Sequence, residues 1–287
     1  MRVRILLVLV VLLIVMQGCL FYPASPSHKF GIDKSINPDR YMRYWDFVDL
    51  SQDEVAELLV VEDYKHNYQP FLIKNQNTDN FSQITLAQPL WSYKVIYNEY
   101  DDSNWLFYSF NDGRKVYLQA TKYIWEKKLK RETYNFQTID RTDSLINNPN
   151  YQWVGNITPV LIKDIDGDNE IELVCLAADA FRSNPRGIYV FDLATGRLKW
   201  KLDTAANISS LIYEDFDLDG KKDLIASTMA LKNNQNVING TTDHSPGIFA
   251  CNTKGEVIYV EKCFDGYGQV LLESIDIDND GTYDIIR

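Results

Sequence analysis

One acidic motif occurs three times in the second half of the chain, and it constrains the fold more than any other sequence feature. The copies read DIDGDNEIE, DFDLDGKKD and DIDNDGTYD, and they occupy residues 164–172, 215–223 and 276–284. Each has acids at positions 1, 3, 5 and 9 and precedes an apolar run. The copies begin 51 and 61 residues apart, which indicates repeated units of about that size.

A degenerate fourth copy lies upstream at residues 49–57. Asp49, Ser51, Asp53 and Glu57 occupy its acid positions, ahead of another apolar run. It begins 115 residues before Asp164, close to the length of two units, so an intervening unit is expected to have lost its acids. The strand-rich segment 95–110, VIYNEYDDSNWLFYSF, is the candidate for that eroded unit.

Clustered carboxylates repel one another unless a cation neutralises them. Calcium prefers six to eight oxygen ligands at about 2.3 to 2.6 Å, which the acids of one such loop can supply around one ion. Position 6 needs a sharp turn, which glycine or asparagine allows, as at Asn169, Gly220 and Gly281. About three structural calcium sites are therefore predicted, and their candidate side-chain ligands are Asp164, Asp166, Asp168, Glu172, Asp215, Asp217, Asp219, Asp223, Asp276, Asp278, Asp280 and Asp284.

Two alternatives compete with this interpretation. An EF-hand shares the D-x-D-x-D-G opening but requires a Glu at position 12 and flanking helices. Position 12 is Cys175, Ala226 or Arg287 here, and the residues that follow each motif favour strands. A metal-free acidic turn would suffice for one copy, but three copies with a fourth acid in register favour calcium.

The segments after the acidic loops predict further strands. Residues 187–200, GIYVFDLATGRLKW, and 247–259, GIFACNTKGEVIY, each read as two apolar runs around a turn that contains Gly196 or Gly255. Each unit therefore offers four antiparallel strands. The predicted fold class is all-β, and sheets repeated at this period are typical of β-propeller blades.

The acidic loops and their β flanks resemble the FG-GAP or VCBS type of repeat, which forms calcium-binding β-propellers. The resemblance covers residue 164 to the C-terminus well and residues 45–80 weakly. It implies that the backbone carbonyl at position 7, which is Glu170, Lys221 or Thr282, adds a ligand. The degenerate copy at Asp49 is expected to bind no metal. FDLATGRLKW also resembles a blade motif of quinoprotein propellers, but it occurs clearly only once.

The N-terminus has the features of an export signal. Two arginines precede a twelve-residue apolar core, Ile5–Met16, which is shorter than the roughly 20 residues of a spanning helix. The ending resembles a bacterial lipoprotein signal in which Cys19 becomes the lipidated first residue, although Met16 and Gln17 depart from the usual pattern. An ordinary cleaved signal or an uncleaved anchor is the alternative.

Charge and cysteine content narrow the function classes. A net charge of −11 argues against nucleic acid or an anionic membrane surface as a partner. The remaining cysteines are Cys175, Cys251 and Cys263. The first two lie in strand-like runs and are expected to be buried thiols, while a bridge between Cys251 and Cys263 stays open.

Catalytic motifs are scarce in the sequence. No G-x-S-x-G, H-E-x-x-H or phosphate-binding loop occurs, and the polar segment 232–247, which contains Asp243 and His244, is expected to be a solvated loop. We therefore expect a non-catalytic binding, sensing or adhesion module at the cell envelope, with an unknown protein or glycan ligand. The alternatives are a propeller-based exported enzyme, such as a polysaccharide lyase or quinoprotein dehydrogenase, and the sensor part of a receptor kinase.

The expected organisation is a signal at residues 1–19, a linker at 20–40 and propeller repeats at 41–287. Only a few residues follow the third acidic loop, whereas propellers usually close with four to eight blades. An incomplete propeller, truncated after the last calcium loop, is therefore expected, and a complete small ring is the alternative.

Overall fold

A computed structural model describes most of the chain after residue 91 and isolated strands before it. The described residues are 41–48, 57–64, 67–73, 82–83, 92–125, 129–141, 155–179, 185–233, 236–277 and 284–286. Side chains are described from residue 92 onward, except at 125, 129–131 and 285–286. The proposed signal and linker, the degenerate acidic loop, Asp278, Asp280 and Thr282 lie outside these ranges.

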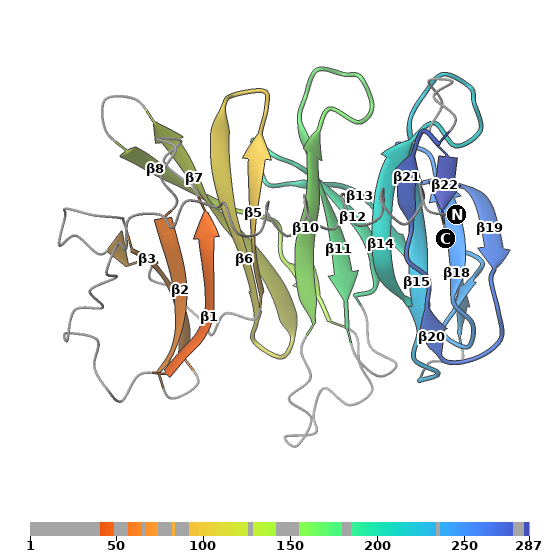
Figure 1. Cartoon of the computed structure of the whole chain (residues 1–287), viewed down its shortest axis with the longest axis horizontal. Helices are drawn as coiled ribbons and strands as arrows, with labels where there is room; N and C mark the ends of the chain where they lie inside the picture. The colour runs from red at the N-terminus through yellow and green to blue at the C-terminus, as the bar shows by residue number, and fades with distance from the viewer. Residues whose placement is uncertain are drawn as a thin grey trace, which may run out of the picture. The chain divides into compact units, whose positions relative to one another are not determined.

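The described residues form four consecutive antiparallel sheets, each with its strands in chain order (Figure 1). Sheet 1 contains β1 (Tyr41–Val48), β2 (Glu57–Tyr64), β3 (Asn67–Ile73) and β4 (Ser82–Gln83). Sheet 2 contains β5 (Ser92–Asn98), β6 (Ser103–Asn111), β7 (Lys115–Trp125) and β8 (Leu129–Asn135), with β9 (Ile139–Asp140) beside β7.

Sheet 3 contains β10 (Asn156–Lys163), β11 (Glu172–Ala178), β12 (Gly187–Asp192) and β13 (Leu198–Asp203). Sheet 4 contains β14 (Asn207–Glu214), β15 (Asp223–Ala230), β18 (Gly247–Cys251) and β19 (Val257–Lys262), with β20 (Gly268–Gln269) beside β15. Two hairpins complete the set: β16 (Val237–Ile238) with β17 (Thr241–Thr242), and β21 (Glu273–Ile275) with β22 (Asp284–Ile286).

The predicted all-β class and the four-stranded antiparallel units are confirmed. None of the described residues is helical, so no described helix has the length and apolarity needed to cross a membrane. Among the described residues the sheets form no closed ring. The propeller arrangement therefore remains a prediction beyond the sheets themselves.

The acidic motif spans the same connection each time it occurs. Its first residue follows the first strand of a unit, and its ninth residue begins the second strand, in sheets 3 and 4 and in the β21–β22 hairpin. Cα pairing across the loop confirms the register, with Lys163 opposite Glu172, Glu214 opposite Asp223, and Ile275 opposite Asp284. Sheet 1 has the same arrangement, because Val48 pairs with Glu57 around the degenerate copy.

Sheet 2 is the predicted eroded unit. Its first two strands pair from Asn98 and Ser103, so only residues 99–102 connect them. The corresponding connections in sheets 3 and 4 have eight residues. The shortened turn leaves no room for the spaced acids of the full motif.

The two predicted hairpins form as expected, and each turn glycine lies against the preceding sheet. Gly196 has φ 70° and Gly255 has φ 80°, a region that favours glycine. A Cβ on Gly196 would lie 2.4 Å from the Asn135 carbonyl oxygen of sheet 2, and one on Gly255 would lie 2.7 Å from the Trp200 ring of sheet 3. Glycine is therefore required for close packing as well as for the turn.

Alternation along the strands buries both faces of sheet 3. On β11, Leu173 and Cys175 pack with residues of sheet 2, whereas Val174 packs with residues of sheet 4. On β12, Phe191 faces sheet 2, where its ring lies 5.7 Å from that of Phe136, and Val190 faces sheet 4. Strands buried on both faces read as continuous apolar runs, which explains the ELVCLA and GIYVF segments.

A chain of buried ion pairs also connects the sheets. Arg141, after β9, donates to Asp179, after β11, through Nε and Nη2 at 2.9 and 3.1 Å. Arg186, before β12, lies 3.6 Å from Asp243 of the segment before β18, and both side chains are fully buried. Asp243 also accepts hydrogen bonds from the backbone N–H groups of Leu231 and Asn233.

The expectation of a solvated loop at residues 232–247 is therefore wrong for Asp243, although His244 is exposed. The buried guanidinium of Arg186 requires a carboxylate partner, and Asp243 supplies it. The polar composition of the segment reflects a buried ion pair as well as surface residues.

Two of the three cysteines after the proposed signal are buried thiols. No disulfide joins Cys251 to Cys263, so the possible bridge between them is absent. Cys175 and Cys251 are buried as predicted, and burial raises the pKa of both thiols, that of Cys251 to about 12 with a further contribution from Asp223.

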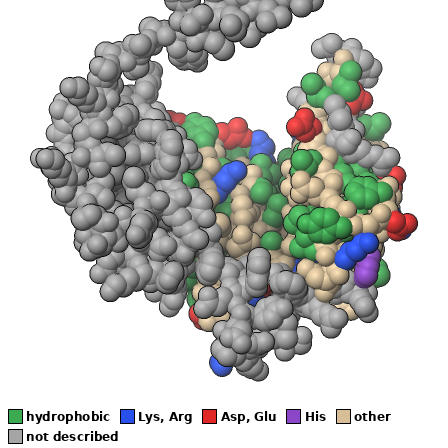
Figure 2. Space-filling model, turned by 60° about the horizontal axis from the view of Figure 1, so that its bottom comes forward, with side chains coloured by type: hydrophobic (Ala, Val, Ile, Leu, Met, Phe, Trp, Pro, Cys, Tyr) green, Lys and Arg blue, Asp and Glu red, His purple; other side chains and the backbone are tan. Residues whose placement is uncertain are grey.

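Apolar side chains remain open to solvent on one face of the described chain (Figure 2). Several large ones belong to β19 and to the segment that follows it, namely Ile258, Tyr259, Val260, Phe264 and Tyr267. β19 ends the strand order of sheet 4, so it is an edge strand with one row of backbone groups unpaired by the described strands.

Asp243→Ala is predicted to destabilise the chain strongly, because it leaves the Arg186 guanidinium buried without its carboxylate. The expected loss is roughly 3 to 5 kcal/mol, measured as a lower midpoint of urea unfolding. Asp140→Ala is the matched control, since its pair with Lys115 at 3.8 Å is exposed and contributes about 0 to 1 kcal/mol. Equal midpoints for the two variants would contradict the buried ion pair.

Thiol labelling is predicted to separate the three cysteines. In a Cys19→Ser background, an aromatic disulfide reagent should react with one thiol of the native protein, Cys263, and with three in denaturant. The buried thiols are protected because they are inaccessible and protonated. Cys263→Ser should abolish the native reaction, and rapid labelling of two or more thiols would show that the core is open.

Candidate metal centre

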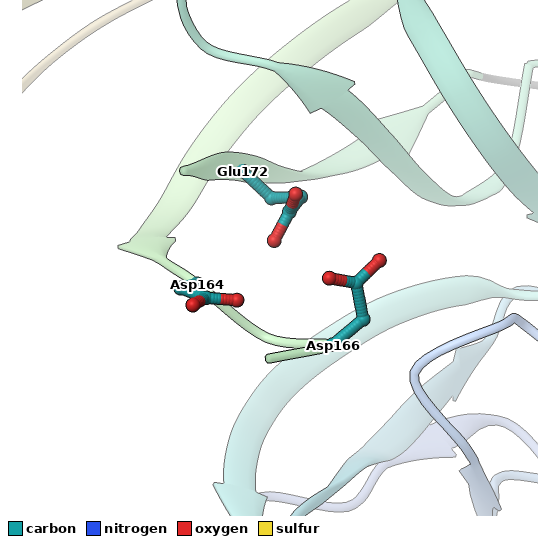
Figure 3. Close-up of side chains that lie close together, drawn as sticks. All are labelled: Asp164, Asp166 and Glu172. Carbon is teal, nitrogen blue, oxygen red and sulfur yellow. The ribbon is translucent and has the colours of Figure 1, made fainter. Parts of the chain in front are cut away.

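The first acidic loop brings three carboxylates together at the start of sheet 3. Asp164 follows β10, Asp166 lies in the loop, and Glu172 is the first residue of β11. One oxygen of each lies within 4.8 Å of the others, and the three side chains point toward a common centre (Figure 3). Two ligands bound at about 2.4 Å from one ion are at most about 4.8 Å apart, so the spacing fits calcium.

The second loop repeats this arrangement at the start of sheet 4. Oxygens of Asp215, Asp217 and Asp223 lie within the same 4.8 Å limit. In both loops the position 1 acid is half-buried, the position 3 acid exposed and the position 9 acid buried. The predicted ligands at positions 1, 3 and 9 are thus brought together in both loops, whereas the two position 5 acids are outside these groups.

Backbone hydrogen bonds explain why the acids recur at fixed positions. The position 1 carboxylate accepts from the N–H of position 6, at 3.0 Å for Asn169 and 2.9 Å for Gly220. The position 5 carboxylates, Asp168 and Asp219, each accept from the N–H of position 7 at 2.8 Å. These hydrogen bonds stabilise the turn of each loop without the help of a cation.

The position 9 acid closes the loop by a hydrogen bond to the backbone of position 2. Glu172 accepts from the backbone N–H of Ile165 at 2.9 Å, and Asp223 accepts from that of Phe216 at 3.3 Å. In the third loop Asp284 accepts from Ile277 at 3.2 Å, so the same bond occurs in all three copies. These bonds fix one oxygen of each position 9 side chain at the centre of its turn.

Positive φ values follow the same pattern in the two fully described loops. Position 6 has φ 67° at Asn169 and 87° at Gly220, as the sequence predicted. Position 4 is also left-handed, with φ 76° at Gly167 and 60° at Leu218. The copies therefore share a backbone conformation, and they retain it even where a leucine must adopt an unfavourable φ.

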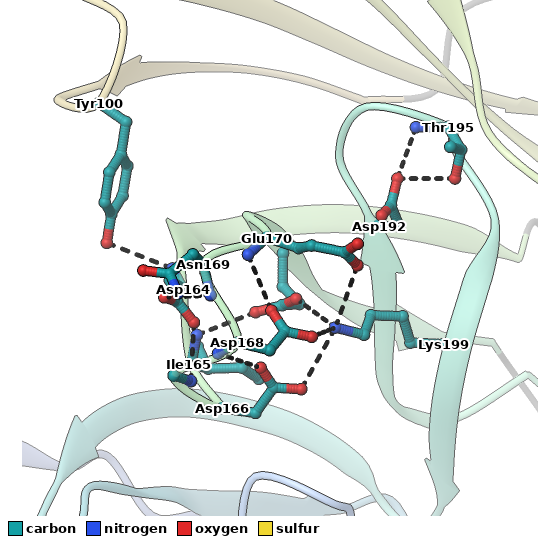
Figure 4. Close-up of polar contacts among 12 residues, drawn as sticks. Tyr100, Asp164, Ile165, Asp166, Asp168, Asn169, Glu170, Asp192, Thr195 and Lys199 are labelled. Carbon is teal, nitrogen blue, oxygen red and sulfur yellow. Dashed lines mark hydrogen bonds and ion pairs between the residues drawn. The ribbon is translucent and has the colours of Figure 1, made fainter.

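A lysine lies inside the first loop. Lys199 Nζ, from β13, is 2.6 Å from Glu172, 3.1 Å from Asp168 and 3.2 Å from Asp166 (Figure 4). It also lies 4.0 Å from Glu170. The ammonium occupies the position where these carboxylates converge, and it neutralises part of their charge.

The second loop has no such lysine. Among the described residues, no lysine or arginine forms an ion pair with Asp215, Asp217 or Asp223; Lys221 pairs with Asp219 at 3.6 Å and Lys222 with Glu214 at 2.9 Å, both at the loop's exposed side. Its converging carboxylates therefore fit a divalent cation without displacing a protein group.

Titration behaviour follows from these surroundings. Burial raises the pKa of Asp223, and the charges of Asp217, Asp219 and Asp215 add to the increase. Burial likewise raises the pKa of Glu172, although Lys199 opposes it. Partial burial works against the charged form of Lys199, but its hydrogen bonds with Glu172, Asp168 and Asp166 outweigh this and raise the pKa of the amine.

The remaining predicted site residues are only partly described. Asp276 and Asp284 flank the third loop at the ends of β21 and β22, while Asp278, Asp280 and Thr282 lie outside the described residues. Glu170 and Lys221 occupy position 7 of their loops, and their backbone N–H groups serve the turn. Lys199 was missed from the sequence because it lies 27 residues after Glu172, on the fourth strand of the sheet.

Comparison with known proteins adds no family assignment. No protein-family model matches the chain, and no curated protein is significantly similar to it in sequence. The resemblance to FG-GAP and VCBS repeats therefore rests on the motif and its spacing.

Asp223→Asn is predicted to stabilise the metal-free protein at neutral pH. Because the pKa of Asp223 is raised on folding, the folded state favours the protonated carboxyl. At pH 7 the carboxylate is charged, and its charge destabilises the folded state; this penalty disappears as the pH falls through the raised pKa. Asparagine removes the charge and retains an acceptor for Phe216. In chelator the melting temperature should rise by about 1 to 3 °C, the scale of a change below 1 kcal/mol in a chain of this size.

The pH dependence supplies the control for this variant. The difference between wild type and Asp223→Asn should shrink as pH is lowered, because Asp223 then becomes protonated. A variant that is less stable than wild type in chelator at pH 7 would contradict the proposed repulsion.

Proposed function

We propose that this chain is an exported, calcium-stabilised β-propeller repeat protein that serves as a non-catalytic binding or sensing module at the cell envelope. The observation that carries the proposal is the second acidic loop, where three carboxylates converge at the junction of two strands without a described counter-ion. Such a cluster is self-repelling until it binds a cation.

Calcium suits this donor set better than the common alternatives. The converging groups are carboxylate oxygens, with no histidine or thiol among them. Zinc and copper favour nitrogen and sulfur ligands, whereas calcium accepts an irregular set of oxygens that a flexible loop supplies. The backbone carbonyls at Glu170 and Lys221 are the additional ligands that the FG-GAP resemblance implies.

A structural role for the metal is supported by its place in each unit. The candidate ligands of a loop come from one turn between consecutive strands, so a bound ion would fix β10 to β11 or β14 to β15. Binding that occurs only in the folded state adds stability by linkage. The metal sites would thus stabilise the sheets, and other surfaces of the protein would bind the ligand.

Face-to-face packing of the sheets supports the propeller form of the proposal. Sheet 3 buries one face against sheet 2 and the other against sheet 4, and the strands of each sheet follow in chain order. Propeller blades are four-stranded sheets that repeat around a central axis. The units at residues 41–287 are proposed as such blades.

The sequence alone supports the proposed export and membrane attachment. The apolar core before Cys19 is typical of a secretory signal, and a cysteine directly after it resembles the lipidation site of a lipoprotein. A protein tethered in this way at the cell surface or in the periplasm would meet millimolar calcium more readily than a cytoplasmic one. Its partner in this proposal is a protein or glycan, whose identity depends on surfaces outside the acidic loops.

Calcium is predicted to raise the melting temperature of the full chain, and chelator to lower it. At calcium about 100 times the dissociation constant, one site adds about 2.7 kcal/mol, which corresponds to roughly 5 to 10 °C in a chain of this size. Asp217→Ala should reduce the shift because it removes a ligand of the second loop. Differential scanning calorimetry measures both effects.

Asp140→Ala is the control for this measurement, since Asp140 is an exposed acid outside the loops. It should keep the full calcium response. An unchanged melting temperature in wild type, together with no calcium found by elemental analysis, would reject the proposed metal sites.

A further inference from the structure

The sheets that carry the two described acidic loops differ at one equivalent position of their fourth strands. In sheet 3, Val190 pairs with Trp200 and Phe191 with Leu198, so Lys199 is the extra residue of a β-bulge. In sheet 4, Ala250 pairs with Tyr259 and Cys251 with Val257, so Ile258 is the extra residue. Lys199 and Ile258 are therefore equivalent in register, and only one of them carries a charge.

The bulge gives Lys199 its access to the loop. Its ammonium forms hydrogen bonds with Glu172, Asp168 and Asp166 at 2.6, 3.1 and 3.2 Å, which uses all three N–H donors. The side chain is 23 % exposed, while its partner Glu172 is only 1 % exposed. The pair with Glu172 is therefore buried on the carboxylate side only, while Lys199 itself stays in contact with solvent.

Two of these partners are carboxylates of the candidate metal group. Asp166 and Glu172 belong to the converging group of the first loop, and both bind the ammonium. A divalent cation at their centre would be brought against a positive charge at ion-pair distance. Calcium and the ammonium therefore compete for the same carboxylates.

We propose that Lys199 is a built-in counter-ion that keeps the first acidic loop folded without metal and lowers its affinity for calcium, whereas the second loop depends on calcium. The inference rests on the proposed calcium function and assigns different behaviour to two copies of one motif. The first loop holds its turn at low calcium. The second responds to calcium, because Ile258 offers no charge.

The test measures calcium binding by isothermal titration calorimetry and melting temperature in calcium and in chelator, on the full chain. Asp223→Asn and Asp284→Asn together disable the second and third loops, so the remaining response reports the first loop. In that background, Lys199→Met should increase the calcium affinity at least tenfold and lower the melting temperature in chelator. Lys199→Gln is the second variant, in case the methionine disturbs folding.

Lys201→Met is the matched control. Lys201 lies on the same strand, pairs with Asp203 at 2.6 Å and is 48 % exposed, without contact to the acidic loop. It should leave the calcium affinity of the first loop unchanged. Ile258→Lys, in the otherwise wild-type chain, should weaken the response of the second loop by transferring the counter-ion to it.

The outcomes distinguish this inference from the proposed function. If wild type responds to calcium but Lys199→Met and Lys199→Gln bind it no more tightly than Lys201→Met, the counter-ion role is overturned and the calcium function stands. If neither wild type nor any Lys199 variant binds calcium, both are overturned. Tighter binding together with a lower melting temperature in chelator supports the counter-ion role.

Discussion

Burial of both faces of sheet 3 is the constraint on which the rest of the structure depends. A strand of sheet 3 sends alternate side chains into two different cores, one shared with sheet 2 and one with sheet 4. The connections between strands lie at the ends of the sheets and hold the acidic motif. The acidic loops occupy one such connection in every unit that retains them, and Asp223 and Glu172 begin strands whose next residues are fully buried.

Charge balance then decides how each loop behaves. In the first two loops the position 9 carboxylate is buried because the strand that it begins is buried, and it lies near the position 1 and position 3 acids. The protein supplies a counter-ion from the fourth strand of the sheet in one copy and none in the other. Identical backbone turns therefore coexist with different electrostatic environments, and the difference arises at Lys199 and Ile258 rather than in the motif.

Sequence reasoning was most successful where local chemistry sets local structure. The acids at fixed spacing predicted the loops and the strand that follows position 9, and the turn glycines predicted the β12–β13 and β18–β19 hairpins. Asn169 and Gly220 have the positive φ that their positions required. Even the degenerate copy at 49–57 spans the expected connection, because strand pairing depends on the apolar flanks and not on the lost acids.

Long-range partners were not predictable in the same way. Lys199 reaches the first loop through a bulge three strands away from β10, and the sequence alone does not give bulge positions. Asp243 lies in a polar segment, yet it is buried because Arg186 from sheet 3 meets it there. Asp243 was expected in a solvated loop and Lys199 was given no role, whereas the surroundings of both are set by how the sheets pack.

The close contact of each turn glycine with the sheet before it has a consequence for folding cooperativity. Gly196 packs on the backbone of sheet 2 and Gly255 on Trp200 of sheet 3, so each unit completes its own hairpin against a surface that belongs to its predecessor. Stability in such an array is a property of nearest neighbours as much as of single units. A defect in one sheet therefore also weakens the hairpin that packs on it, and the stability of each unit is coupled to that of its neighbours.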